Sequence, residues 1–109
     1  MKKPLILISN DDGIEADGIK ALTKEIRKFA EVFVAAPHTQ QSAVGHSITM
    51  ASPIRARKTL MFKDFYGYAV EGTPADSVKI AVHTLLKSRK IDLLISGINQ
   101  GANTAINII

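Results

Sequence analysis

The chain contains no cysteine. Disulfide bonds and thiolate metal sites are therefore excluded, and any metal site has to be built from other side chains. Internal repeats, low-complexity tracts and linkers are also missing, and 109 residues are enough for one domain at most.

Long apolar runs are missing as well. The chain begins Met1-Lys2-Lys3, as a signal peptide could, but the apolar run that follows is interrupted at Asn10 and Asp11. This run is too short for the core of a signal peptide or for a membrane span. We therefore expect no membrane association and take the cytoplasm as the default location.

Positive charge is present but not concentrated. The formal net charge is +4, and the Lys and Arg residues are scattered between Lys2 and Lys90 without a dense run. The glycine-aromatic and zinc-knuckle signatures of nucleic-acid modules are absent, so we expect no nucleic-acid duplex as a partner. With 46% hydrophobic and 22% charged residues, the composition is typical of a folded globular domain.

The first 36 residues predict a strand, a helix and a second strand. Residues 5–9 are continuously apolar, which is typical of a parallel strand buried on both faces. A helix is expected to begin at Asp17, the predicted N-cap. Its apolar residues recur at helical spacing; these are Ile19, Leu22, Ile26 and Phe29. Residues 31–36 form a second apolar strand ended by Pro37, and this order predicts parallel pairing.

The remaining elements are a polar loop, a ribbon, a helix and a third strand. Residues 37–50 form a long polar loop, and such loops in compact domains are usually functional. Apolar and polar residues alternate in part over residues 54–58 and 66–70, which indicates a small antiparallel ribbon inserted outside the core. Thr73-Pro74-Ala75-Asp76 predicts a helix start, with threonine as N-cap and the acid reaching back to it. The helix would bury Val78, Ala81, Val82 and Leu85, and residues 91–96 form the third core strand.

These elements predict an α/β fold of the Rossmann-like, three-layer αβα type with a mainly parallel sheet. The chain is apolar to its last residues, Ile108 and Ile109, where a finished domain usually has a polar end. Three strands and two helices would also leave a sheet edge unpaired. We therefore expect residues 1–109 to be the N-terminal portion of a single α/β domain whose C-terminal portion is absent.

Polar side chains follow each of the three predicted core strands. Asp11 and Asp12 come directly after the first strand, Ser42 lies in the loop after the second, and Asn99 follows the third. Open α/β sheets bind ligands at the carboxyl ends of their strands, so we expect these side chains to converge. Neighbouring carboxylates repel each other unless a cation is present, and oxygen donors suit Mg2+ or Mn2+. The sequence therefore predicts a divalent metal site at this edge.

Four segments resemble, in the same order, the successive motifs of the SurE family, named for stationary-phase survival. They are Ser9–Ile14, Ser42 with Gly45-His46-Ser47, Gly72–Asp76, and Ser96–Asn99 with Gly101-Ala102-Asn103. The resemblance implies a metal-dependent phosphomonoester hydrolase, a 5'(3')-nucleotidase that acts on nucleoside monophosphates. It also implies a homo-oligomer, a dimer or a tetramer, for the full-length protein.

The resemblance further assigns the site residues. One Mg2+ or Mn2+ per subunit would be bound by Asp11, Asp12, Ser42 and Asn99. Asp11, Asp12 and Asn99 would be the catalytic residues. Substrate contacts are expected from Asn10, Gly45, His46 and Asn103.

The chain departs from the family pattern at a few positions. His38-Thr39 stands where Asp-Arg is common, Ala43 where glycine is common, and Gln100 where a histidine occurs. These departures concern substrate preference, because the four expected metal ligands are intact.

Two other functions are open on the sequence alone. A receiver domain of a signalling relay also has an acidic pair after its first strand, but it requires an aspartate at the end of its third strand. This chain has Ser96-Gly97 there. The second is metal and nucleotide binding without turnover, which the isolated 109-residue chain would show if it retained metal affinity and lacked catalysis without its C-terminal portion. Asn-Asp-Asp-Gly alone is also a common turn, and we interpret His83, within a helical pattern, as structural.

Overall fold

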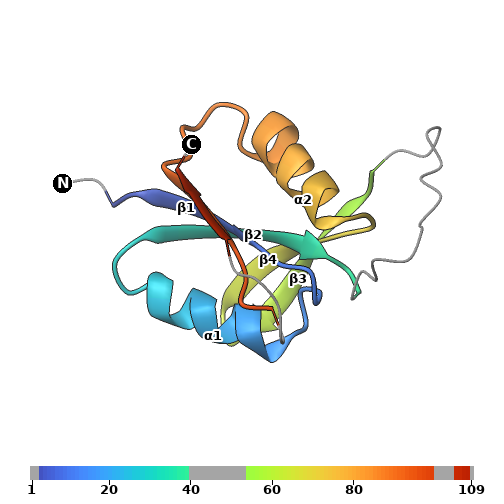
Figure 1. Ribbon diagram of the computed structural model, residues 1–109, viewed down its shortest axis with the longest axis horizontal. Helices are drawn as coiled ribbons and strands as arrows, with labels where there is room; N and C mark the ends of the chain where they lie inside the picture. Colours follow the sequence, from blue (N-terminus) through green and yellow to red (C-terminus); the bar gives the residue numbers. More distant parts are fainter. Residues whose placement is uncertain (1–2, 40–53, 100–104, 109) are drawn as a thin grey trace.

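The chain folds around one six-stranded sheet in a computed structural model that describes residues 3–39, 54–99 and 105–108 (Figure 1). The strands lie in the order β3-β4-β2-β1-β5-β6. The elements are β1 (Leu5–Ser9), α1 (Asp17–Ile26), β2 (Glu31–Pro37), β3 (Ala56–Phe62), β4 (Phe65–Val70), α2 (Pro74–Ile80), a wider helical turn (Ala81–Leu85), β5 (Leu93–Ser96) and β6 (Ala105–Ile108).

The centre of the sheet is parallel and its two outer strands are antiparallel. β1 pairs in parallel with β2 and β5, and β2 pairs in parallel with β4. β3 and β6 run antiparallel to β4 and β5. This arrangement confirms the predicted mainly parallel α/β fold, to which β6 adds a strand that the sequence pattern did not indicate.

The two helical segments cover opposite faces of the sheet, which gives the three layers (Figure 1). Along β1, Ile6 and Ile8 pack in one cluster with Ile19 of α1. Leu5 and Leu7 pack in a second cluster that contains residues from the wider turn after α2. Because each face of β1 is covered, all five of its residues are buried, as the continuous apolar run predicts.

The expected ribbon is present, but it belongs to the main sheet. β3 pairs antiparallel with β4, and β4 continues the sheet by pairing in parallel with β2 through Tyr68, Ala69 and Val70. Met61 and Ala69 are buried in the same cluster as Ile6 and Ile8. The expectation that the ribbon lies outside the core is therefore wrong, because its alternating apolar residues cover an extension of the core.

Helix α1 differs from the prediction at both ends. Its N-cap is Ala16, which makes no side-chain capping bond, so the expectation that Asp17 is the cap is wrong by one residue. Asp17 is instead the first helical residue, where a carboxylate interacts favourably with the helix dipole. Phe29 lies beyond the end of α1 and is 58% exposed, so it does not belong to the buried stripe.

The second helical segment begins as predicted. The Thr73 hydroxyl accepts a hydrogen bond from the Asp76 amide at 3.1 Å, and the Asp76 carboxylate accepts one from the Thr73 amide at 2.9 Å. Further along, the Leu86 amide donates to the Ala81 carbonyl at 2.8 Å, which widens the last turn. Leu86 is thereby buried, although the predicted stripe ended at Leu85.

His83, on the same helical segment, is exposed. In the described part of the chain, no helix is long and apolar enough to cross a membrane.

Candidate metal site

Strands β1 and β5 end side by side and bring two of the predicted site residues to one edge of the sheet. Ser9 and Ser96 are register partners at the ends of these parallel strands. The Gly97 amide donates to the Ser9 carbonyl at 2.8 Å and continues the pairing beyond both strands. Asp11 and Asn99 follow within three residues of these partners, so both belong to the carboxyl edge.

Asp11 and Asn99 are in direct contact. The Asp11 backbone amide donates to Asn99 Oδ1 at 2.9 Å, and Asn99 Nδ2 donates to Asp11 Oδ2 at 3.2 Å. This pair of bonds fixes the carboxamide orientation, because a backbone N–H requires the oxygen and a carboxylate requires the NH2 group. Asn99 is only 6% exposed, whereas Asp11 is exposed. The predicted convergence of these two residues is therefore found, and their roles as metal ligands stay predictions.

The loop that carries both acids is closed by Asn10. Asn10 is fully buried; its Nδ2 donates to the Gly13 carbonyl at 2.9 Å, and its Oδ1 accepts from the Gly13 amide at 3.2 Å. Gly13 has a φ of 104°, a conformation that favours glycine. The segment is thus the turn that its composition indicates, and this turn presents Asp11 and the half-buried Asp12 at its tip.

The closed loop also defines what Asn10 does in this structure. Both polar groups of its side chain bond to Gly13, so the side chain holds the loop in shape. The Ile14 amide then donates to the Pro37 carbonyl at 2.9 Å, which ties the loop to the end of β2. The predicted substrate contact of Asn10 stays a prediction.

The donor set fits a hard divalent cation. Asp11 and Asp12 supply carboxylate oxygens and Asn99 supplies an amide oxygen, which are the ligand types that Mg2+ and Mn2+ prefer. The described residues contain no group of three or more His, Cys, Asp or Glu side chains that could hold a metal ion. Within them, the predicted ligands are two carboxylates and one amide, and their role stays a prediction. Ser42, Gly45, His46 and Asn103 lie outside the described residues, and their assignments stay predictions.

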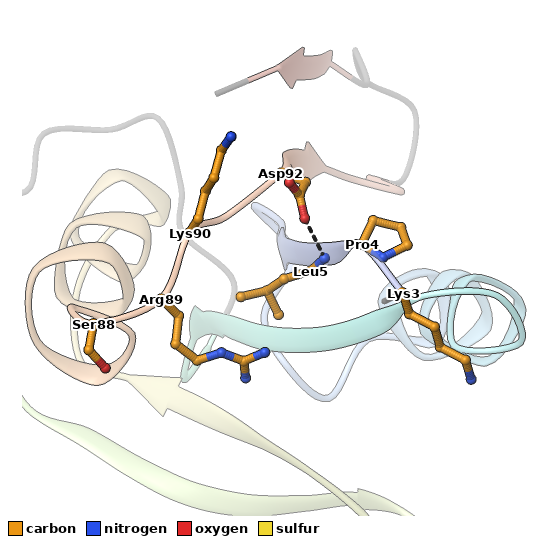
Figure 2. A pocket seen from close by; sticks show the side chains of 7 residues that line it. All are labelled: Lys3, Pro4, Leu5, Ser88, Arg89, Lys90 and Asp92. Carbon is orange, nitrogen blue, oxygen red and sulfur yellow. Dashed lines mark hydrogen bonds between the residues drawn. The ribbon is translucent and has the colours of Figure 1, made fainter. Parts of the chain in front are cut away.

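A different hollow, of about 530 Å3, lies at the opposite edge of the sheet (Figure 2). The Asp92 carboxylate accepts a hydrogen bond there from the Leu5 amide at 2.8 Å; Leu5 begins β1 and Asp92 directly precedes β5. Arg89 also lines the hollow and pairs with Glu31 through two bonds of 2.6 Å, which raise the pKa of its guanidinium above the ordinary value. Ligands of open α/β sheets bind at the carboxyl edge, so we place the candidate site at Asp11 and not in this hollow.

The sequence and the fold are similar to those of known proteins. The family described as "Survival protein SurE" matches residues 6–109. The chain is 46% identical over all of its 109 residues to the 5'-nucleotidase SurE of Cytophaga hutchinsonii, of which it covers 42%. It is 54% identical over 99 residues to the 5'-nucleotidase SurE of Paramagnetospirillum magneticum; the match covers 90% of this chain and 36% of that one.

A solved structure supports the same relationship. The crystal structure of the SurE protein from Aquifex aeolicus superimposes with a TM-score of 0.72 at 40% sequence identity, covering 92% of this chain and 39% of that one. The chain thus spans about two fifths of the length of these relatives. On the match of residues 6–109 and on this fold, the chain belongs to the SurE family.

Proposed function

We propose that the chain carries the metal site of a divalent-metal-dependent phosphomonoester hydrolase, a 5'-nucleotidase that acts on nucleoside monophosphates. The observation that carries the proposal is the pairing of Asp11 with Asn99 beside Asp12, at the edge where open α/β sheets bind ligands. Relatives named 5'-nucleotidase SurE support the reaction class. The receiver-domain alternative has no support, because β5 ends at Ser96 without an aspartate to accept phosphate.

The charges of the donor set suit an anionic substrate. Asp11 and Asp12 together carry two negative charges, which one Mg2+ or Mn2+ would balance, and Asn99 adds an oxygen donor without adding charge. A phosphomonoester would then approach a site with no excess negative charge. A third carboxylate in place of Asn99 would repel it.

The protein residues hold and orient these donors. The two bonds between Asn10 and Gly13 restrict the loop, and the Asn99 NH2 group fixes one oxygen of Asp11. Such preorganisation reduces the entropy lost when a ligand is bound. The bound ion would polarise the phosphoryl oxygens and lower the pKa of an attacking water molecule.

The proposal is tested by measuring phosphate release from AMP and from an aryl phosphate, in the presence of Mn2+ or of EDTA. We expect release that requires Mn2+ and is lost in Asp11→Asn. Asp17→Asn is the matched control, because Asp17 is an exposed acid in the first turn of α1 outside the donor set. Release that persists in EDTA or in Asp11→Asn would contradict the proposal. Manganese binding that depends on Asp11 without any release would instead assign metal binding without turnover.

A further inference from the structure

Gly18, the second residue of α1, packs directly against the loop that carries Asn99. A Cβ atom placed on Gly18 would overlap the carbonyl oxygen of Ile98 and would lie 3.3 Å from its carbonyl carbon and 3.5 Å from its Cβ. The overlap is with backbone atoms, which cannot rotate away as the end of a side chain can. The missing side chain at position 18 therefore allows α1 to approach this loop closely.

The backbone conformation of Gly18 does not itself demand glycine. Gly18 lies within α1, where alanine is the more favourable residue, and its φ is outside the left-handed range. Close packing against Ile98 is thus the physical reason for glycine at this position.

The contact joins the two halves of the candidate metal site. On one side, Ile98 precedes Asn99, whose carboxamide bonds to Asp11 at 2.9 and 3.2 Å. On the other side, α1 follows directly from the loop that carries Asp11 and Asp12, and the Ala16 amide donates to the Gly13 carbonyl at 3.1 Å. The packing of α1 against Ile98 is therefore one of the contacts, besides the pairing of β1 with β5, that hold Asn99 next to Asp11.

We propose that Gly18 is a positioning residue for the candidate metal site: its lack of a side chain sets Asn99 within hydrogen-bond distance of Asp11. The inference rests on the proposed function only in assigning this pair to a metal ion. A side chain at position 18 displaces the Ile98 carbonyl, separates Asn99 from Asp11 and weakens the binding of Mn2+.

Gly18→Ala tests the inference, with Gly67→Ala as the matched control. A Cβ atom on Gly67 would meet Met61 Sδ at 2.7 Å, together with side-chain atoms of Ile14 and Val34 at 3.1 Å. The control thus also crowds a closely packed glycine, but it does not touch Ile98. Comparing the two variants separates an effect on the site from a general loss of stability.

The first readout does not depend on metal. In EDTA, hydrogen exchange of the Asp11 amide and the NMR shifts of the Asn99 side-chain amide report on the contact itself. We expect roughly tenfold faster exchange in Gly18→Ala, about the effect of losing one hydrogen bond, and a displaced Asn99 signal. Gly67→Ala should leave both close to wild type. Equal behaviour of the two variants overturns the inference.

The second readout is the affinity for Mn2+, measured by electron paramagnetic resonance. We expect a Kd raised roughly tenfold or more in Gly18→Ala, and unchanged affinity in Gly67→Ala. Unchanged affinity in Gly18→Ala overturns the inference. A wild-type chain that binds no Mn2+ refutes the proposed function instead, and the exchange measurement still decides the role of Gly18.

If Gly18→Ala does not fold, a double variant takes its place in the exchange measurement. The side chain of Ile98 is 47% exposed, and glycine at this position has the backbone freedom to move its carbonyl away from a methyl group. The double variant Gly18→Ala, Ile98→Gly should fold and still show fast exchange at Asp11. Wild-type exchange in this folded double variant overturns the inference.

Discussion

Replacing Asn99 with aspartate tests the contact between the two loops. The change keeps an oxygen for the Asp11 amide, but it puts a carboxylate oxygen where Asn99 Nδ2 now donates to Asp11 Oδ2 at 3.2 Å. A favourable hydrogen bond to a charged group becomes a repulsion between two negative charges. Without a divalent ion, Asn99→Asp should therefore be less stable than the wild type at neutral pH.

The size of the loss follows from the position of the pair. Two charges about 4 Å apart interact by about 1 kcal/mol in water and by about 4 kcal/mol near a protein surface. Asp11 is exposed, so the repulsion should lie near the lower value. The lost hydrogen bond contributes about 1 kcal/mol more, a low value that again reflects the exposure of Asp11. We expect the free energy of unfolding to fall by about 2–3 kcal/mol in EDTA.

Urea unfolding with and without Mn2+ measures this effect. A cation between the carboxylates removes their repulsion, so Mn2+ should stabilise Asn99→Asp more than it stabilises the wild type. An ion at about one hundred times its Kd stabilises a protein by about 2.7 kcal/mol, which is readily measured. Asn99→Ala is the control, because it loses both hydrogen bonds without gaining charge and should gain less from Mn2+. Equal stability of Asn99→Asp and wild type in EDTA would refute the reasoning.

Three further predictions concern the acidic turn, the cap of α2 and the core. Asn10→Ala removes both bonds that close the acidic turn, so it should lower the unfolding free energy by about 2–3 kcal/mol in urea titrations and weaken Mn2+ binding; an unchanged midpoint would contradict this. Thr73→Ala removes a cap and should lose about 1 kcal/mol, whereas the exposed Thr84→Ala should change stability by less than about 0.5 kcal/mol. Leu7→Ala should lose about 2–5 kcal/mol, far more than the half-exposed Leu60→Ala, and similar losses would argue against the core assignment.

The parts of the fold that depend on neighbouring residues could be predicted from the sequence. The apolar run of β1 indicates burial on both faces by itself, and the start of α2 at Thr73 depends only on residues within one turn. The pairing of β4 with β2 could not be predicted, because alternation shows that a strand exists and not which strand is its neighbour. The burial of Leu86 in place of Leu85 depends on one widened turn, which periodicity does not reveal.

The candidate site, like the fold, could be predicted from the sequence only in part. The rule that parallel strands present ligands at their carboxyl ends is enough to bring Asp11 near Asn99 across 88 residues of sequence. Asparagine commonly bonds to the backbone of its own turn, so a role of Asn10 in holding the loop is consistent with the motif, but its complete burial depends on tertiary packing that the motif does not show. The contact of Gly18 with Ile98 depends on tertiary packing, and a glycine in the first turn of a helix was its only signal in the sequence.

The location of bound Mn2+ decides whether these residues form a metal site. Paramagnetic Mn2+, titrated into the 15N-labelled chain, broadens the NMR signals of nuclei close to it. The metal-site assignment predicts that the amides of Asp11, Asp12 and Asn99 lose their signals first and that Asp11→Asn prevents this. Broadening that begins at exposed acids elsewhere, such as Glu25 or Asp64, while the signal of Asp11 persists would contradict it.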